Sequence, residues 1–129
     1  MGACPVKASF SGGPSAPGQA RSFVTAQLDS VIGEAEGPSH DDVVLITSEL
    51  VTNAVRAGAG TIDVTVRATA DRLYLDVTDD AAGWPQPQSS GTEDEGGRGL
   101  AIVDRLADSW SAIRKKNGKT VTAAWSRQP

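Results

Sequence analysis

Cysteine and histidine are nearly absent from this chain of 129 residues, which has one of each, Cys4 and His40. A single cysteine permits no disulfide within the chain, and this is typical of proteins in a reducing cytoplasm. Structural zinc sites and Cys/His catalytic pairs need more of these side chains than the chain has. The sequence therefore argues against both kinds of site.

The chain also lacks an excess of positive charge and any long apolar run. Its 12 Lys and Arg residues stand against 16 Asp and Glu residues, for a net charge of −4. Such a balance provides no basic surface to hold nucleic acid or an anionic membrane. Runs such as VVLI at 43–46 are too short to span a membrane, and the first ten residues lack the apolar core of a secretory signal. We therefore expect a cytoplasmic protein without direct nucleic-acid or membrane binding.

Three common phosphate-binding patterns are missing as well. The sequence has no G-x-x-x-x-G-K-[ST], so it contains no P-loop. Its GAG at 58–60 follows a predicted helix and precedes a predicted strand, which is the reverse of the dinucleotide-binding order. Neither HRD nor DFG occurs, and this excludes the eukaryotic-type protein kinase fold.

The length suits one compact domain, and apolar residues at helical spacing predict three helices in it. The first runs from about Pro17 to about Ile32. The second begins after Ser39, a good N-cap residue, and ends near Ala57. The third covers 99–110.

Alternating apolar and polar residues predict two hairpins. The first pairs 61–69 with 72–79, and the second spans 111–126 around an Asn-Gly turn. Within the N-terminal segment, 1–15, residues 7–11 are a candidate edge strand of the domain that occupies 16–129. The element order predicts an α/β two-layer sandwich, with a mixed, mostly antiparallel sheet covered on one face by about three helices.

The second predicted helix is apolar over most of its surface, yet it carries Glu49, Asn53 and Arg56 within a narrow arc at about 100° per residue. Glu49 and Asn53 are therefore expected at the edge of the core, where a polar group needs a partner. The alternative is a solvated stripe on a half-buried helix.

Two further motifs flank an unusual segment. In LDVTDDAAGWP a strand ends in Asp79 and Asp80 before a glycine turn, and in GGRGLAIVDRL glycines lead directly into a helix, whose free N–H groups favour an anion such as phosphate. Each motif alone is also typical of an ordinary turn or loop. Between them, about 81–98, lies a stretch rich in Gly, Pro, Ser and acid that is too long for a simple connection, so we predict a lid over a site.

Taken in this order, the motifs resemble the GHKL superfamily of ATPases, which includes gyrase, the heat-shock chaperone ATPases, MutL and sensor histidine kinases. SELVTNAV resembles the N box, VTDDAAGWP the first glycine box and GRGLAIV the second. The resemblance extends from residue 16 to the end and implies a Bergerat-type ATP-binding fold. ELVTNAVR and the small size are most similar to the anti-sigma-factor serine kinases and their stand-alone bacterial relatives.

The resemblance implies a role for each matching residue. Asn53 would supply an oxygen to Mg²⁺, and Glu49 would act as general base toward the attacking hydroxyl or water. Asp79 would accept a hydrogen bond from the adenine amine, and Gly83 would let the backbone approach the base and sugar. Arg56 occupies a basic position that either contacts a phosphate or partner or is a surface arginine.

The second glycine box would bind the phosphates of ATP through Gly97, Arg98, Gly99 and Leu100, with backbone N–H groups and the Arg98 charge. At the first glycine box the chain departs from the usual Asp-x-Gly-x-Gly, because Ala81 replaces the first glycine. If that position needs a positive φ, alanine costs on the order of 1 kcal/mol, or roughly fivefold in affinity. Ala57 likewise stands where close relatives often have His.

The function that the resemblance implies is an ATP- and Mg-dependent serine/threonine protein kinase acting as an anti-sigma factor. It would phosphorylate an anti-anti-sigma (STAS) protein, hold a sigma factor as its second partner, and, as is common in the family, form a homodimer. The alternative is a nucleotide-dependent protein-binding module without phosphoryl transfer, which Ala81 keeps open while Glu49 favours the kinase. A detached histidine-kinase catalytic domain ranks last, since His40 at a helix start is unlike a phosphoacceptor.

Overall fold

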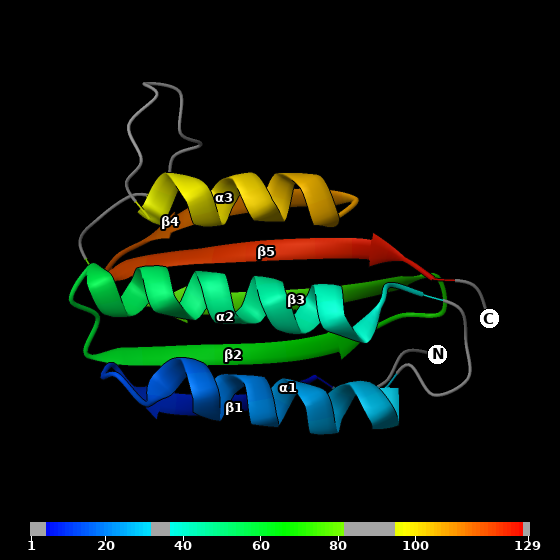
Figure 1. Ribbon diagram of the computed structural model, residues 1–129, viewed down its shortest axis with the longest axis horizontal. Coiled ribbons are helices and arrows are strands. Elements are labelled where there is room, and N and C mark those ends of the chain that lie inside the picture. The colour runs from blue at the N-terminus through cyan, green and yellow to red at the C-terminus, as the bar shows by residue number, and fades with distance from the viewer. Residues whose placement is uncertain (1–4, 32–36, 82–94, 128–129) are drawn as a thin grey trace.

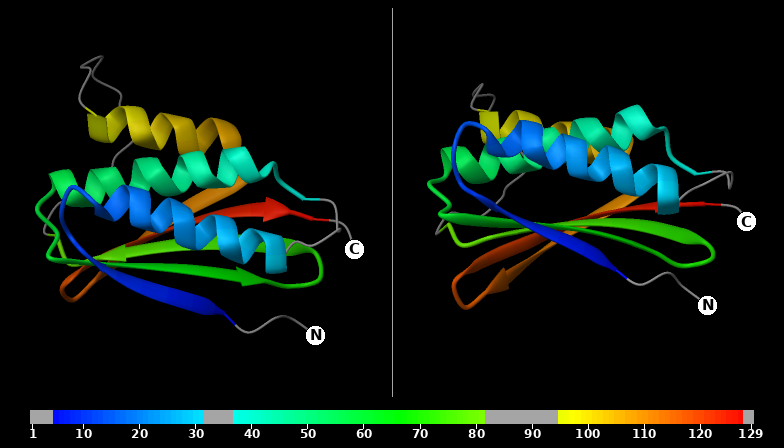
Figure 2. Two further views of the ribbon diagram at one scale, coloured as in Figure 1. Left: turned by 60° about the horizontal axis from the view of Figure 1, so that its bottom comes forward. Right: turned by 90° about the horizontal axis from the view of Figure 1, so that it is seen from below.

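The computed structural model describes residues 5–31, 37–81 and 95–127. In this part of the chain one sheet forms one layer and three helices cover a single face of it, in front of the sheet in Figure 1 and above it in Figure 2. The predicted α/β two-layer sandwich is therefore confirmed.

The sheet contains five strands in the described residues. In the order β1-β2-β3-β5-β4, with every neighbouring pair antiparallel, they are β1 (Val6–Ser11), β2 (Thr61–Ala68), β3 (Arg72–Asp79), β5 (Gly118–Ser126) and β4 (Ser109–Lys115). The expectation of a mixed sheet is thus corrected, because the described strands form no parallel pair. Hairpin connections suffice for β2–β3 and β4–β5, and antiparallel pairing is what short hairpins permit.

The helices are α1 (Ala16–Val31), α2 (His40–Arg56) and α3 (Glu95–Leu106), and α2 lies between the other two (Figure 1). Ser39 caps α2 as predicted, because its Oγ accepts hydrogen bonds from the backbone N–H groups of Asp41 at 3.1 Å and Asp42 at 3.4 Å. None of the helices in the described ranges is long and apolar enough to cross a membrane.

Helix α3 differs from its prediction at both ends. It begins at Glu95, so residues 95–98 belong to the helix rather than to the predicted lid. Of the rest of that lid, 82–94 lie outside the described residues. It ends at Leu106, whose carbonyl accepts a 2.9 Å bond from the indole N–H of Trp125. The predicted helix included Trp110, but Trp110 pairs with Ala123 in the sheet, and this cross-strand pairing outweighs helical periodicity.

The core lies between the helices and one face of the sheet. Alternate residues of the central strands face the helices and are at most 4 % exposed; they include Ile62, Val64, Leu75, Val77, Val121 and Trp125. The same alternation places Asp79, two residues after Val77, and Lys119, two residues before Val121, on this face. Two charged side chains thus lie at the end of an otherwise apolar layer.

Candidate functional site

The predicted site residues that the structure describes gather at one end of the sandwich. Here α2 and β3 end while β5 and α3 begin, at the left of Figure 1. The arrangement follows from the topology, because β3 and β5 are antiparallel neighbours and α2 lies above them. Residues that are far apart in the sequence therefore meet at this end.

Helix α2 contributes Glu49 and Asn53, one turn apart and both half-buried. The Asn53 Oδ1 atom is buried and accepts no hydrogen bond from any residue that the structure describes. An unsatisfied buried polar atom costs about 1–3 kcal/mol, so folded proteins seldom keep one without a reason. An amide oxygen is a ligand that Mg²⁺ accepts, and the buried, unpaired oxygen fits the predicted metal contact.

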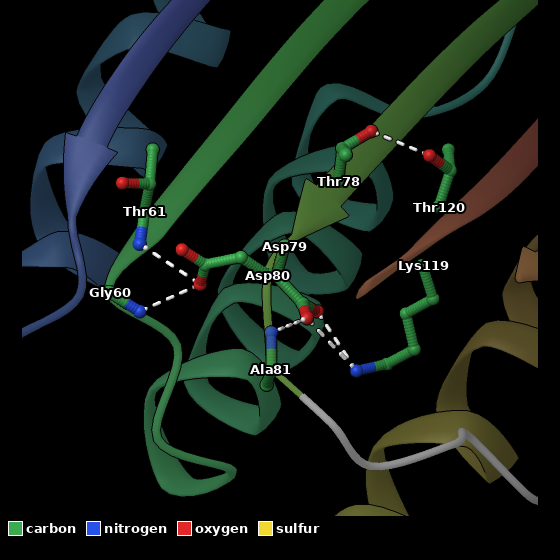
Figure 3. A network of polar contacts seen from close by, with 8 residues as sticks. All are labelled: Gly60, Thr61, Thr78, Asp79, Asp80, Ala81, Lys119 and Thr120. Carbon is green, nitrogen blue, oxygen red and sulfur yellow. Dashed lines mark hydrogen bonds and ion pairs between the residues drawn. The ribbon is translucent and has the colours of Figure 1, made fainter. Parts of the chain in front are cut away.

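Strand β3 contributes Asp79, which pairs with Lys119 of β5 (Figure 3). The ammonium nitrogen Nζ lies 3.1 Å from Asp79 Oδ1 and 3.0 Å from Oδ2. Both residues are buried, at 6 % and 7 % exposure. Asp79 therefore holds a cation in the position where the resemblance places the adenine amine.

Lys119 was not among the residues predicted for the site. Its sequence position could have indicated this, because Lys119 follows the Asn-Gly pair and precedes Val121 by two residues. Strand alternation then puts it on the core face of β5. A lysine at a core-facing strand position needs a partner, but only the strand register shows that the partner is Asp79.

Asp80 has a different role from its neighbour. Its Oδ1 accepts hydrogen bonds from the backbone N–H groups of Gly60 at 2.8 Å and Thr61 at 3.2 Å (Figure 3). These two bonds hold the pKa of the Asp80 carboxyl below its usual value. Asp80 thereby ties the loop between α2 and β2 to the end of β3.

Ala81 does not adopt the conformation that would make alanine unfavourable. Among the described residues only glycines have a positive φ, so the backbone of Ala81 does not carry that strain. Its N–H donates a 2.8 Å hydrogen bond to Asp79 Oδ1, and its side chain is buried. The fivefold weakening expected for a strained alanine therefore does not apply.

The second glycine box lies at the start of α3. The free N–H groups of a helix that begins at Glu95 belong to residues 95–98, which include Gly97 and Arg98. Gly99 and Leu100 follow in the next turn, and Gly83 lies outside the described residues. The phosphate contacts of this box remain predictions.

An open hollow of about 400 Å³ lies beside the site, lined by Asp80, Ala81 and 114–118. It contains neither Asn53 nor Asp79, so it borders the predicted site without being that site.

Comparisons with known proteins identify the family and support the fold. The family model described as a histidine kinase-like ATPase domain matches residues 12–125. The crystal structure of the RsbU and RsbW domains of Rv1364c from Mycobacterium tuberculosis is similar over 98 % of this chain, with a TM-score of 0.69 and 21 % identity. This chain spans 34 % of that one, and at such identity the likeness shows the fold alone. No curated protein is similar enough in sequence to match.

Proposed function

This chain belongs to the histidine kinase-like ATPase domain family, and from that premise we propose that it binds Mg–ATP at this end of the sheet. In this proposal it then transfers the γ-phosphoryl group to a serine or threonine of a partner protein. The observation that carries the proposal is the Asn53 Oδ1 atom, buried and without a hydrogen-bond partner among the described residues. Glu49, one turn before Asn53, is placed to act as a general base. Asp79, at the end of β3, is placed to bind the nucleobase.

The chemistry assigns one task to each residue. Bound Mg²⁺ would offset the negative charge of the phosphates, and Asn53 would hold it through Oδ1. Glu49 accepts the proton of the acceptor hydroxyl. The hydroxyl oxygen bonds to the γ-phosphorus, the bond from that phosphorus to the β–γ bridging oxygen breaks, and ADP leaves. Asp79 accepts a hydrogen bond from the adenine amine and orients the nucleotide.

The partners follow from the same resemblance. We propose a STAS-type anti-anti-sigma protein as acceptor and a sigma factor as the second partner, with a cytoplasmic location and a homodimeric state. The likeness of ELVTNAVR to the anti-sigma-factor kinases supports this choice, as does the RsbW domain in the similar solved structure. The net charge of −4 favours protein partners over direct contact with DNA.

Replacing Asn53 by alanine should separate binding from folding. We expect the free energy of unfolding without nucleotide to be unchanged or higher by up to about 1 kcal/mol, because the change removes an unsatisfied buried oxygen and improves helix propensity. Mg–ATP binding should be lost. Calorimetric titration with Mg–ATP and thermal unfolding with and without it test both points.

The matched control is Gln27→Ala, which removes a half-buried amide from α1. It should leave Mg–ATP binding as in the wild type. Unchanged binding in Asn53→Ala would contradict the metal role, and a folded wild type that ignores millimolar Mg–ATP would contradict the proposed function as a whole.

Glu49→Gln tests phosphoryl transfer. The variant should bind Mg–ATP normally but transfer at least about a hundredfold more slowly, since a positioned general base contributes about 10²–10⁴. Transfer is measured with γ-labelled ATP and a purified STAS-type protein. Equal rates in variant and wild type would remove Glu49 from the mechanism, and binding without transfer in either would favour the nucleotide-dependent binding module.

A further inference from the structure

The Lys119–Asp79 pair occupies core-facing strand positions at which apolar side chains would normally pack. Asp79 and Lys119 are direct partners in the β3–β5 register, next to the buried Val77 and Val121 on the helix-covered face. Burying two charges carries a desolvation penalty that their attraction offsets only in good geometry. Replacement by well-packed apolar residues is often neutral or stabilising, so stability alone gives a weak account of this pair.

The hydrogen-bonding capacity of the pair is only partly used. Asp79 Oδ1 accepts from the Ala81 N–H and from Lys119, while Oδ2 accepts from Lys119 alone among the described residues. A carboxylate oxygen has two lone pairs and an ammonium group has three N–H donors, so contacts with Asp79 through one hydrogen bond and one ion pair leave Lys119 with donor capacity. Because Nζ and Oδ2 lie 3.0 Å apart, the acceptor capacity left on Oδ2 and the donor capacity left on Lys119 are close together.

This arrangement is complementary to one edge of adenine. The exocyclic amine is a donor, and the adjacent ring nitrogen N1 is an acceptor. Guanine in the same orientation has the opposite pattern, because its O6 would face the carboxylate and its N1–H would face the ammonium. Neighbouring hydroxyls do not supply the donor, since Thr78 and Thr120 lie on the other face of the sheet and bond each other at 2.7 Å (Figure 3).

We propose that Lys119 is a second base-reading residue, which donates a hydrogen bond to adenine N1 while Asp79 accepts one from the amine. This inference rests on the proposed ATP site and extends it from one base contact to two. It makes Lys119 a specificity determinant for adenine over guanine in addition to a neutralising partner of Asp79.

The test compares Mg–ATP with Mg–1-deaza-ATP, in which a C–H group replaces N1. Wild type and Lys119→Met are titrated with both by calorimetry. We expect the wild type to bind 1-deaza-ATP at least about tenfold more weakly than ATP, because a hydrogen bond to a charged group is lost. Lys119→Met should bind ATP more weakly and no longer distinguish the two nucleotides. Mg–GTP should bind the wild type more weakly than Mg–ATP.

Controls separate folding from recognition. Lys7→Met removes an exposed lysine of β1 and should retain the tenfold difference. If Lys119→Met does not fold, the wild-type comparison of the nucleotides still decides, and Asp79→Asn/Lys119→Met removes both charges together. A wild type that binds ATP and 1-deaza-ATP equally, or ATP and GTP equally, overturns the inference while leaving the ATP site intact. Tighter ATP binding by Lys119→Met would show that Lys119 masks Asp79, and no ATP binding at all would overturn both proposals.

Discussion

Replacing Gly118 by alanine is expected to lower the free energy of unfolding by about 2–5 kcal/mol, through backbone strain combined with a steric clash. Gly118 has a φ of +137°, a region that L side chains seldom adopt. A Cβ atom there would lie 1.8 Å from the carbonyl oxygen of Asp79, so the β3 and β5 backbones must separate to admit it. Urea unfolding monitored by circular dichroism measures the loss.

Two other glycines separate the contribution of backbone strain from that of the steric clash. Gly58 has a φ of +89° but open space around a Cβ, so Gly58→Ala should show strain alone, about 1 kcal/mol. Gly13→Ala has neither problem and should be nearly neutral. If Gly118→Ala costs no more than Gly58→Ala, the close approach of β5 to Asp79 is not required for folding.

The local parts of the fold were predictable because short-range chemistry determines them. Ser39 caps α2 through its own oxygen. The Asn-Gly pair marked the β4–β5 hairpin, but the predicted turn is displaced by one residue: Lys116 and Asn117 form it, and Gly118 already pairs with Lys115 in the sheet. The end of α3 was not predictable in this way. Trp110 fits a helical period, yet its strand pairing with Ala123 and the Trp125 bond to Leu106 terminate the helix, and both are long-range contacts.

The two adjacent aspartates illustrate the same limit at the site. Composition marks both as turn residues, and the family resemblance selects Asp79. Strand alternation explains the difference, because Asp79 continues the core-facing series of β3. Asp80 lies past the strand end, and its carboxylate accepts hydrogen bonds from the backbone N–H groups of Gly60 and Thr61. The buried ion pair needed a further fact, the register of β3 against β5, which no local pattern contains.

Separating Asp79 from Lys119 should have the second large effect on stability. Asp79→Asn and Lys119→Met each leave one buried charge unpaired, and we expect either to lower the free energy of unfolding by about 3–5 kcal/mol. The double variant leaves no buried charge and should lose less than the sum of the two, with a coupling of about 2 kcal/mol or more. Urea unfolding of the wild type, both single variants and the double variant measures that coupling.

The other face of the same sheet provides a control pair. Arg67 lies 2.7 Å from Asp76, and this hydrogen bond raises the pKa of the Arg67 guanidinium, yet Arg67 is 39 % exposed in its side chain. A double-mutant cycle of Arg67 and Asp76 should give a coupling free energy of about 1 kcal/mol or less, and this coupling should decrease with added salt. A Lys119–Asp79 coupling no larger than this would mean that water reaches the pair in solution. A large, salt-insensitive coupling would mean that the atoms proposed to recognise adenine also stabilise this end of the sheet. An Asp79 variant would then lose nucleotide binding and stability together. Asn53→Ala would be the variant that tests nucleotide binding without a loss of stability.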